Sequence, residues 1–376
     1  MKITLIKEKL REVLQVVDRI CARRGDLTIL NFFHLRAVNG RVTVYATDLE
    51  LAYEAEVAGR IEHEGEVLLP ARQFMQLLEG IGDDMLTLER GERNLVVRGE
   101  RSISTIAGLI EEEYPLPVEV KRERRLEIES TVLDEALGKV STCLRTAELF
   151  KPELAGVYWQ LTDQHLTLVA TDTLRLTEAK IRCQFFESNA GDVKLLVPKK
   201  LIQEYLGLRR KPHKVKVYLE PHQVTFDLEH QHFTVKLMSA DYPDYRRIIP
   251  DNFLLTFHLE REAFAKALKL NKVFLDQTKE VRLRVQPKEN TLEIYSRNEL
   301  LGDTTTTLPI QIKEQTLSDH ETFEVRFNHE FLQDGVATAT GDTLFLGLNL
   351  PTGDQVKPLV IRDPLDEDYT YLLMPL

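Results

Sequence analysis

The feature that most constrains this chain is an internal repeat with a period of about 125 residues. The segment EGEVLLPARQFMQLLEGI (64–81) predicts a strand, a proline at a helix start, and then apolar side chains at helical spacing. The segments GDVKLLVPKKLIQEYLGL (191–208) and TFEVRFNHEFLQDGVATA (322–339) repeat this order, the last with Asn328 in place of the proline. Proline suits the first turn of a helix and asparagine is a favoured N-cap, so all three segments predict the same strand-to-helix junction.

The sequence ahead of each unit repeats as well. Three stretches alternate around a polar turn as paired strands do: VTVYATDLELAYEAEV (42–57), LTLVATDTLRLTEAKI (166–181) and LEIYSRNELLGDTTTTL (292–308). Each follows a predicted amphipathic helix, marked by Leu10, Val13, Leu14 and Val17, by Leu133, Ala136, Leu137 and Val140, and by the segment 260–275. Helices and strands in this order, three times over, predict an α+β chain of three similar domains. Such a chain forms an extended or curved object and not an enzyme built around one pocket.

The length of 376 residues is more than one hydrophobic core usually occupies, which agrees with several domains. The composition turns charged in VKRERRLEIES (120–130) and brings in proline in IIPDNFLLTF (248–257). We therefore expect domains at 1–124, 125–252 and 253–376.

Neither a membrane span nor a disulfide framework is expected. No apolar run approaches the roughly 18 residues that a transmembrane helix needs, and MKITLIKEKLREVL at the N-terminus lacks the apolar core of a signal peptide. The three cysteines, Cys21, Cys143 and Cys183, are far apart and lack the CxxC spacing of a zinc site. A reducing cytoplasm fits this pattern best.

Positive charge is concentrated in the predicted helices, although the net charge of the chain is −11. The residues are Lys7, Lys9, Arg11, Arg19, Arg23 and Arg24 in the first helical segment, Lys199, Lys200, Arg209, Arg210, Lys211 and Lys214 in the second, and Lys266, Lys269, Lys272 and Lys279 in the third. Two interpretations stay open: these are solvated helix faces, or equivalent helices of the repeat line one surface that contacts phosphates. Phosphate contacts need positive charge at loose spacing and read no sequence, and no base-reading motif is present.

An enzyme would have to use Asp48 and Asp172 as a carboxylate pair, or His230 and His232 as metal ligands. Both aspartates follow an apolar strand at a turn, where an Asx-type hydrogen bond to the backbone is the common role. The alternating positions in EHQHFTV place both histidines on one strand face, but no further ligands stand at useful spacing. No phosphate-binding loop, Rossmann glycine pattern or nucleophile elbow occurs. We predict no catalytic residue, no metal and no cofactor, and keep a metal-dependent hydrolase using Asp48 and Asp172 as an alternative.

The stretch MSADYPDYRRIIP (238–250) resembles the signature that closes the middle domain of the bacterial DNA polymerase III β subunit, the sliding clamp. DEDYTYLLMPL (366–376) resembles the closing strand and tail of that family, and LVATDTLRL and ELAGVYWQ (153–160) resemble two middle-domain segments. MKITLIKEKLREVLQVV and ATDLEL are similar to the family's first domain. The resemblance covers the whole chain in order.

This resemblance implies three repeated DNA-clamp domains, each with two helices packed on antiparallel β-sheets, in a ring-shaped head-to-tail homodimer. Such a ring encircles duplex DNA without reading its sequence and confers processivity on the replicative DNA polymerase. It performs no chemistry. The implied partners are duplex DNA, the polymerase, the clamp loader and other proteins that carry a short peptide motif, with no membrane, and the implied location is the cytoplasm, at the nucleoid.

The resemblance also places a partner-peptide groove between the middle and C-terminal domains. Position by position, it carries over to Leu154, Thr171, Thr173, Leu174, Arg175, Leu176, Pro243, Arg247, Ile248, Leu372, Leu373, Met374, Pro375 and Leu376. Leucine and methionine supply an adaptable apolar floor, and Arg175 and Arg247 are expected to grip backbone carbonyls or an acidic residue of the ligand. Each of these residues has a structural alternative; Leu372 and Leu373, for example, could be ordinary strand core.

Two departures from the family concern this groove. Thr173-Leu174 stands where members often carry Gly-His, and the short Arg-Leu tail after the Met-Pro dipeptide is missing. These changes leave the groove in place and alter the peptides it is expected to prefer. They also motivate a second alternative, a clamp paralogue specialised for repair or carried on a mobile element.

The family's DNA contacts and subunit boundary carry over in the same way. The implied DNA-binding residues are Arg24, Arg72, Lys151, Lys199, Lys200, Arg209 and Arg210. The implied dimer interface lies at two threonine-containing edge strands, with Ile103 and Ile106 on one and Thr304, Thr305 and Thr306 on the other.

Overall fold

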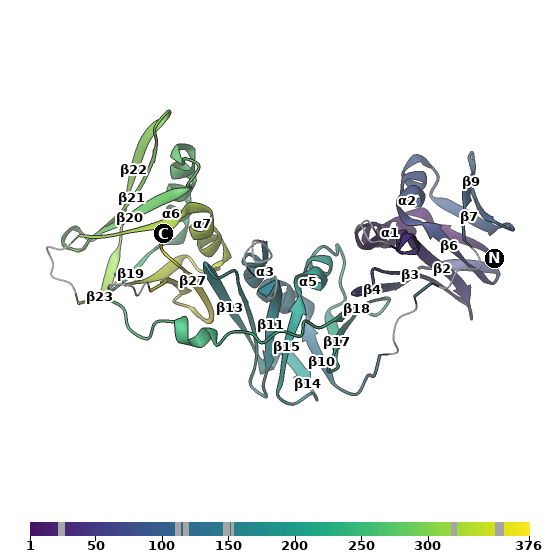
Figure 1. Cartoon of the computed structure of the whole chain (residues 1–376), viewed down its shortest axis with the longest axis horizontal. Helices are drawn as coiled ribbons and strands as arrows, with labels where there is room; N and C mark the ends of the chain where they lie inside the picture. The colour runs from purple at the N-terminus through teal and green to yellow at the C-terminus, as the bar shows by residue number, and fades with distance from the viewer. Residues whose placement is uncertain are drawn as a thin grey trace. The chain divides into compact units, whose positions relative to one another are not determined.

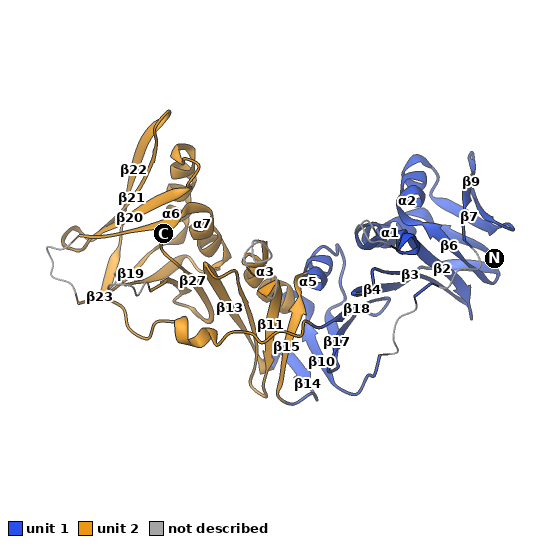
Figure 2. Cartoon of the chain, viewed as in Figure 1, with its two compact units in different colours: residues 1–131, 184–191, 200–237 blue, residues 132–183, 192–199, 238–376 orange. Residues whose placement is uncertain are grey.

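The computed structural model describes residues 1–21, 27–109, 114–115, 120–145, 151, 154–316, 322–349 and 357–376. Its contacts divide the chain into two compact units (Figure 2). The first unit comprises Met1–Thr131, Gln184–Gly191 and Lys200–Leu237, and the second Val132–Cys183, Asp192–Lys199 and Met238–Leu376. The division passes through the middle repeat, because its strands belong to two different sheets.

The first unit contains two antiparallel sheets, and Figure 1 labels most of their strands. The five-stranded sheet has the order β5 (Gly59–His63), β1 (Lys2–Ile6), β7 (Met85–Arg90), β8 (Asn94–Arg98), β9 (Ile103–Ala107). The nine-stranded sheet has the order β14 (Phe186–Ser188), β10 (Arg125–Glu129), β16 (Lys214–Leu219), β17 (Gln223–Asp227), β18 (Gln231–Lys236), β4 (Leu51–Glu56), β3 (Arg41–Thr47), β2 (Phe32–Val38), β6 (Gly65–Pro70). Its helices are α1 (Lys7–Cys21), α2 (Ala71–Gly80) and, from Lys200, α5 (Lys199–Leu206).

The second unit repeats this plan. Its nine-stranded sheet has the order β15 (Val193–Pro198), β11 (Gly156–Leu161), β12 (His165–Thr171), β13 (Arg175–Arg182), β27 (Asp366–Leu373), β26 (Leu359–Asp363), β25 (Thr343–Leu348), β19 (Leu255–Glu260), β23 (Gln311–Gln315). A four-stranded sheet has the order β22 (Gly302–Pro309), β21 (Thr291–Asn298), β20 (Glu280–Gln286), β24 (Phe323–Asn328). Its helices are α6 (Arg261–Asn271), α7 (His329–Thr338) and, from Val132, α3 (Ser130–Ser141).

Each nine-stranded sheet joins two repeats through a single strand pair. In the first unit β18 of the middle repeat pairs with β4 of the first, with Phe233 opposite Tyr53. In the second unit β13 of the middle repeat pairs with β27 of the third, with Leu176 opposite Leu372. The backbone hydrogen bonds of a sheet therefore connect successive repeats.

The apolar stripes of the helices pack onto these sheets, as the helical spacing predicts. Leu10, Leu14 and Val17 of α1 are at most 1% exposed, and α7 buries Leu332 and Val336 equally well. Gly335 lets α7 approach β27 closely, because a Cβ atom at this position would lie 2.6 Å from the ring of Tyr371.

The predicted strand-to-helix junctions are confirmed at all three places. β6 leads into α2, β15 into α5 and β24 into α7. The Asn328 side chain caps α7 by accepting hydrogen bonds from the backbone N–H groups of Glu330 and Phe331. Pro70 differs in detail from the expectation: it is the N-cap of α2, with extended backbone, and does not lie within the first turn.

A buried histidine at the start of α7 makes stability depend on pH. The His329 side chain is fully buried, and its Nε2–H donates to the carbonyl of Leu268 on α6 at 2.7 Å. Burial lowers the pKa of His329 below its usual 6.5. At a pH between the lowered pKa of the folded state and the usual pKa of the unfolded state, the unfolded chain binds a proton at His329 and the folded chain does not. Stability therefore falls as the pH drops below about 6.5.

We therefore predict that His329→Gln reduces the loss of unfolding free energy between pH 7 and pH 5, because the variant has no imidazole to protonate. Urea unfolding at a series of pH values measures this, with the wild type as reference. An unchanged pH dependence in the variant would contradict the assignment.

Candidate functional site

The turn after β12 is held by Asp172. Its Oδ1 accepts the backbone N–H groups of Leu174 and Arg175 at 3.1 and 2.9 Å. The Thr171 hydroxyl donates to the Arg175 carbonyl at 2.7 Å, and Thr173 takes a φ of 76° in the left-handed region. Asp172 thus fixes the backbone from which β13 starts, as an Asx-type turn does.

The turn after β3 has the same structure in the first unit. Asp48 Oδ1 accepts the N–H groups of Glu50 and Leu51 at 3.2 and 2.9 Å. The Thr47 hydroxyl donates to the Leu51 carbonyl at 3.1 Å, and Leu49 takes a φ of 74°. The prediction that both aspartates fix turns is confirmed by these hydrogen bonds.

The two turns differ in the cation that pairs with the aspartate. Asp172 forms an ion pair with Arg175 of its own turn, Nε to Oδ2 at 2.9 Å. Asp48 has Leu51 at the equivalent position and pairs instead with Lys200, which α5 supplies. Lys200 is 6% exposed. A charge removed from water requires a counter-charge, and the repeat meets this requirement from two different positions.

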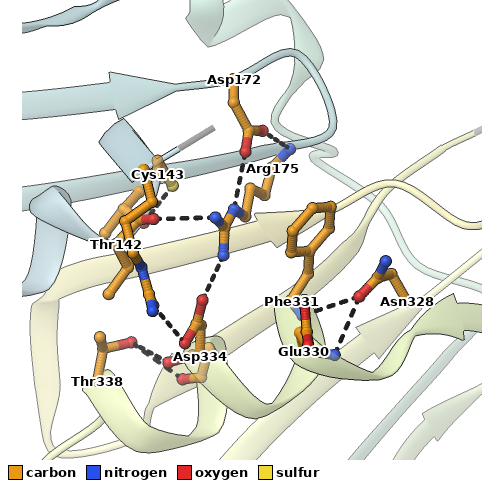
Figure 3. Close-up of polar contacts among 12 residues, drawn as sticks. Thr142, Cys143, Asp172, Arg175, Asn328, Glu330, Phe331, Asp334 and Thr338 are labelled. Carbon is orange, nitrogen blue, oxygen red and sulfur yellow. Dashed lines mark hydrogen bonds and ion pairs between the residues drawn. The ribbon is translucent and has the colours of Figure 1, made fainter. Parts of the chain in front are cut away.

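Arg175 also connects its turn to α7 (Figure 3). Its Nη1 lies 2.5 Å from Asp334 Oδ2, and its Nη2 donates to the Thr142 carbonyl at 2.9 Å. The ring of Phe331 lies 4.1 Å from the guanidinium carbon, and Asp334 also pairs with Arg145 at 2.7 Å. The Arg175 side chain is 1% exposed, so its guanidinium holds the turn against α7. This differs from the expected direct grip on a ligand, because these contacts already engage the group.

The C-terminal tail lies beside this turn. The Met374 N–H donates to the Leu174 carbonyl at 2.8 Å, which extends the pairing of β13 with β27 by one more bond. The Leu376 N–H donates to the Arg326 carbonyl of β24 at 2.9 Å. The last residues are therefore ordered by backbone hydrogen bonds.

An aromatic segment between the middle and third repeats covers the neighbouring sheet face. Tyr242 stacks on Tyr158 with ring centroids 4.8 Å apart, and the Tyr245 hydroxyl donates to Glu178 Oε2 at 2.6 Å. Burial raises the pKa of Tyr242 and of Tyr245. Below them lies an apolar cluster made of Val169, Leu176, Tyr245, Val360 and Leu372.

Tyr158, Tyr242 and Tyr245 were not among the residues predicted from the sequence. The signal was present, because the Tyr-Pro pair at 242–243 repeats the pair at 114–115. Tyr114 packs on Tyr45 and Leu68 in the first unit in a comparable way.

The structure divides the fourteen predicted groove residues by exposure. The buried ones are Leu154, Thr171, Arg175, Leu176, Leu372 and Leu373. The exposed ones are Thr173, Leu174, Pro243, Arg247, Ile248 and Leu376, with Met374 and Pro375 half-buried. We call the exposed and half-buried set the rim. Leu372 and Leu373 are strand core, at 2% and 0% exposed, which is the structural alternative considered for them.

The predicted DNA-binding residues also differ in their exposure to solvent. Arg72, Lys151, Arg209 and Arg210 are exposed, and Lys199 is half-buried. The burial of Lys200 and its pairing with Asp48 argue against a phosphate contact by this residue. Arg24 lies outside the described residues.

The predicted dimer residues lie on two strands at the edges of their sheets. Ile103 and Ile106 belong to β9, the last strand of the five-stranded sheet, and the Ile103 side chain is 68% exposed. Thr304, Thr305 and Thr306 belong to β22, the first strand of the four-stranded sheet.

The described residues give no support to a metal-dependent enzyme. They contain no cluster of three or more histidine, cysteine or carboxylate side chains that could hold a metal. His230 and His232 line two different cavities, and His232 contacts Asp227 at 3.4 Å. Within the same described part of the chain, no helix is long and apolar enough to cross a membrane.

Comparison with known proteins shows which family shares this architecture. Residues 1–118, 127–244 and 246–376 match the family models of the N-terminal, central and C-terminal domains of the DNA polymerase III beta subunit. The chain is 26% identical to the beta sliding clamp of Caulobacter vibrioides over 100% of both chains. It is 25% identical to that of Helicobacter pylori over 99% of this chain and 96% of the relative.

Solved structures agree in fold. The sliding clamp of Bacillus subtilis superposes with a TM-score of 0.89 at 21% identity, covering 100% of this chain and 99% of that one. The DNA polymerase III subunit beta of Pseudomonas aeruginosa superposes with a TM-score of 0.87 at 22% identity over 100% of both chains. The chain belongs to the DNA polymerase III β-subunit family and consists of three β-clamp domains.

We predict that Arg175→Leu, which copies the residue of the first turn, lowers the unfolding free energy by about 3–5 kcal/mol, because it leaves buried Asp172 without its cation. Urea unfolding followed by tyrosine fluorescence and far-UV circular dichroism measures the loss. Arg182→Leu on the same strand is the matched control: its side chain is 51% exposed and pairs with Asp368, so its effect is expected within about 1 kcal/mol. Equal effects of the two substitutions would contradict a structural role for Arg175.

Proposed function

We propose that this protein is a DNA sliding clamp: two copies close a ring around duplex DNA and hold the replicative DNA polymerase on its template. The observation that carries the proposal is the match of the three clamp-domain models, in order, along the chain. The proposed domains are 1–124, 125–252 and 253–376, the proposed location is the cytoplasm at the nucleoid, and the clamp itself catalyses no reaction.

A closed ring stays on DNA by topology and needs no tight contact. Weak phosphate contacts suffice, and tight ones would oppose sliding. The net charge of −11 together with exposed Arg72, Lys151, Arg209 and Arg210 suits this requirement. We assign these four residues and Lys199 to exchangeable contacts with the duplex.

We propose that the ring closes where β9 of one copy pairs with β22 of the other. Both are edge strands, and an edge strand offers unpaired backbone groups to another chain. Exposed Ile103 and the threonines of β22 suit such a strand pair.

We further propose that the rim binds short apolar peptide segments of the polymerase, the clamp loader and other partners. Leu174, Ile248 and Leu376 are 36%, 48% and 65% exposed, so three large apolar side chains are available to a partner. Arg247 is 84% exposed and can reach a peptide carbonyl or carboxylate, although it also pairs with Asp244 at 2.7 Å.

The ring makes retention on DNA depend on the form of the DNA. Loaded on nicked circular DNA, the protein should remain with the circle through gel filtration and be lost once the circle is cut. Topological linkage is the reason, so retention should survive salt that removes simple phosphate contacts. Equal loss of the protein from circular and from linear DNA would contradict the proposal.

We predict that removing residues 374–376 weakens the binding of labelled peptides from the host's replicative polymerase at least about tenfold. The truncation removes two side chains of the rim, half-buried Met374 and exposed Leu376. The cut stops after Leu373 because β27 must remain whole. Fluorescence anisotropy measures affinity, and native mass spectrometry checks that the dimer persists. Leu365→Ala is the matched control, since Leu365 is 91% exposed and lies outside the rim. Unchanged binding after truncation would mean that peptides bind elsewhere.

A further inference from the structure

A second cavity lies on the face of the nine-stranded sheet in the second unit. Its volume is about 640 Å³, and its walls include Glu178, Arg246, Ile249, His258, Phe345 and Arg362. None of these residues belongs to the predicted groove, to the proposed DNA contacts or to the proposed dimer strands.

The cavity floor is one row of the sheet. Arg362 lies opposite Phe345 in the pairing of β26 with β25, and Phe345 lies opposite His258 in the pairing of β25 with β19. On the other side Glu178 lies opposite Thr370, and Arg362 Nε lies 3.4 Å from the Thr370 hydroxyl. This row is two residues along the strands from the row that holds Leu176, Leu372 and Val360, so it shares a face with that apolar cluster.

The cavity wall carries three cations, Lys180, Arg246 and Arg362, and three carboxylates, Glu178, Asp363 and Glu367, and neither arginine forms an ion pair with a carboxylate among the described residues. Arg362 donates to the Thr370 hydroxyl at 3.4 Å. Arg246 donates to Gln160 at 3.1 Å and lies beside Tyr245, and this tyrosine together with nearby Glu178 raises the pKa of Arg246. The carboxylate of Glu178 is already engaged by the Tyr245 hydroxyl and by Lys180 at 3.2 Å.

A second carboxylate at the wall, Asp363, is also engaged, because it accepts the backbone N–H groups of Gly341 and Leu365. Glu367 remains exposed at the border. Two guanidinium groups are therefore available to a ligand, beside carboxylates that would repel a continuous polyanion such as a nucleic-acid backbone.

The remaining wall is apolar and aromatic. Phe345 and His258 meet edge to face with centroids 5.9 Å apart, and half-buried Ile249 faces the same cavity. Burial and the nearby Lys313 lower the pKa of His258, so the imidazole is neutral near pH 7. The space suits a carboxylate carried on a short aliphatic stem.

We propose that this cavity binds an acidic side chain of the same partner peptides that place their apolar residues on the rim. The inference rests on the proposed clamp function. The segment 243–249 supports it, because Pro243, Arg247 and Ile248 belong to the rim while Arg246 and Ile249 line the cavity. One extended peptide can therefore contact both, and aspartate or glutamate flanking the apolar anchor raises its affinity.

The test uses fluorescein-labelled dodecapeptides with one apolar anchor, Leu-Ala-Leu-Phe, flanked before or after by Asp-Asp or by Asn-Asn. Of the two Asp-Asp peptides, with the acidic pair before or after the anchor, the one that binds the full-length protein more tightly is compared with its Asn-Asn counterpart. At low salt it should bind about tenfold more tightly than that counterpart, as two charge-assisted hydrogen bonds allow. Arg246→Gln combined with Arg362→Gln should abolish this ratio and leave the affinity of the Asn-Asn peptide unchanged. Arg182→Gln, which removes a guanidinium of the same unit that already pairs with Asp368, should keep the ratio.

Equal affinities of Asp-Asp and Asn-Asn peptides for the wild type would overturn the inference and leave the clamp function standing. Failure of every anchor peptide to bind would remove the rim proposal and this inference with it, while retention on circular DNA tests the ring separately. Displacement of the bound Asp-Asp peptide by a single-stranded oligonucleotide in the wild type, but not in the double variant, would assign the cavity to phosphate and also overturn the inference.

Discussion

An aspartate paired with one cation holds each of the two turns from which the repeats are joined; Asp172 is buried and Asp48 is half-buried. β4 begins directly after the Asp48 turn and pairs with β18, and β13 begins directly after the Asp172 turn and pairs with β27. Because a shift of one residue would move every side chain to the opposite face, the start of these two strands must be fixed. The turn hydrogen bonds fix it, and the counter-ions make burial of the carboxylates tolerable.

The different origin of the two cations has a functional consequence. Lys200 comes from a neighbouring helix and forms its ion pair with Asp48, so the first turn keeps an ordinary packing role. Arg175 comes from the turn itself and reaches on to Asp334, which ties the second turn to α7. The carbonyl of Leu174 then receives the tail through Met374, and the exposed side chains of this turn and tail form part of the rim. The rim is thus built on a rigid base.

Much of this fold follows from the sequence, because it repeats. The helical apolar spacing located α1, α2, α3, α5, α6 and α7, and the alternating stretches located the strand pairs on either side of ATDL and ATDT. Asn328 as an N-cap was readable from residue type alone. The burial of Arg175 and Lys200 was not, since a cation looks the same in sequence whether it meets solvent, a phosphate or a carboxylate of the same chain.

The strand pairs that join the repeats could not be predicted from the sequence either. Pairing of β13 with β27 connects segments about 190 residues apart, and no local pattern specifies such a contact. The cavity beside Arg246 and Arg362 depends on the same pairing, because its floor combines β13, β27, β26, β25 and β19.

The most direct test of this account is a pair of double-mutant cycles in urea unfolding. One cycle combines Asp172→Asn with Arg175→Met, and the other combines Asp48→Asn with Lys200→Met. The account predicts a favourable coupling energy above about 1 kcal/mol in both cycles, as ion-paired residues in direct contact show. A coupling near zero in either cycle would contradict the claim that each junction turn depends on its own ion pair.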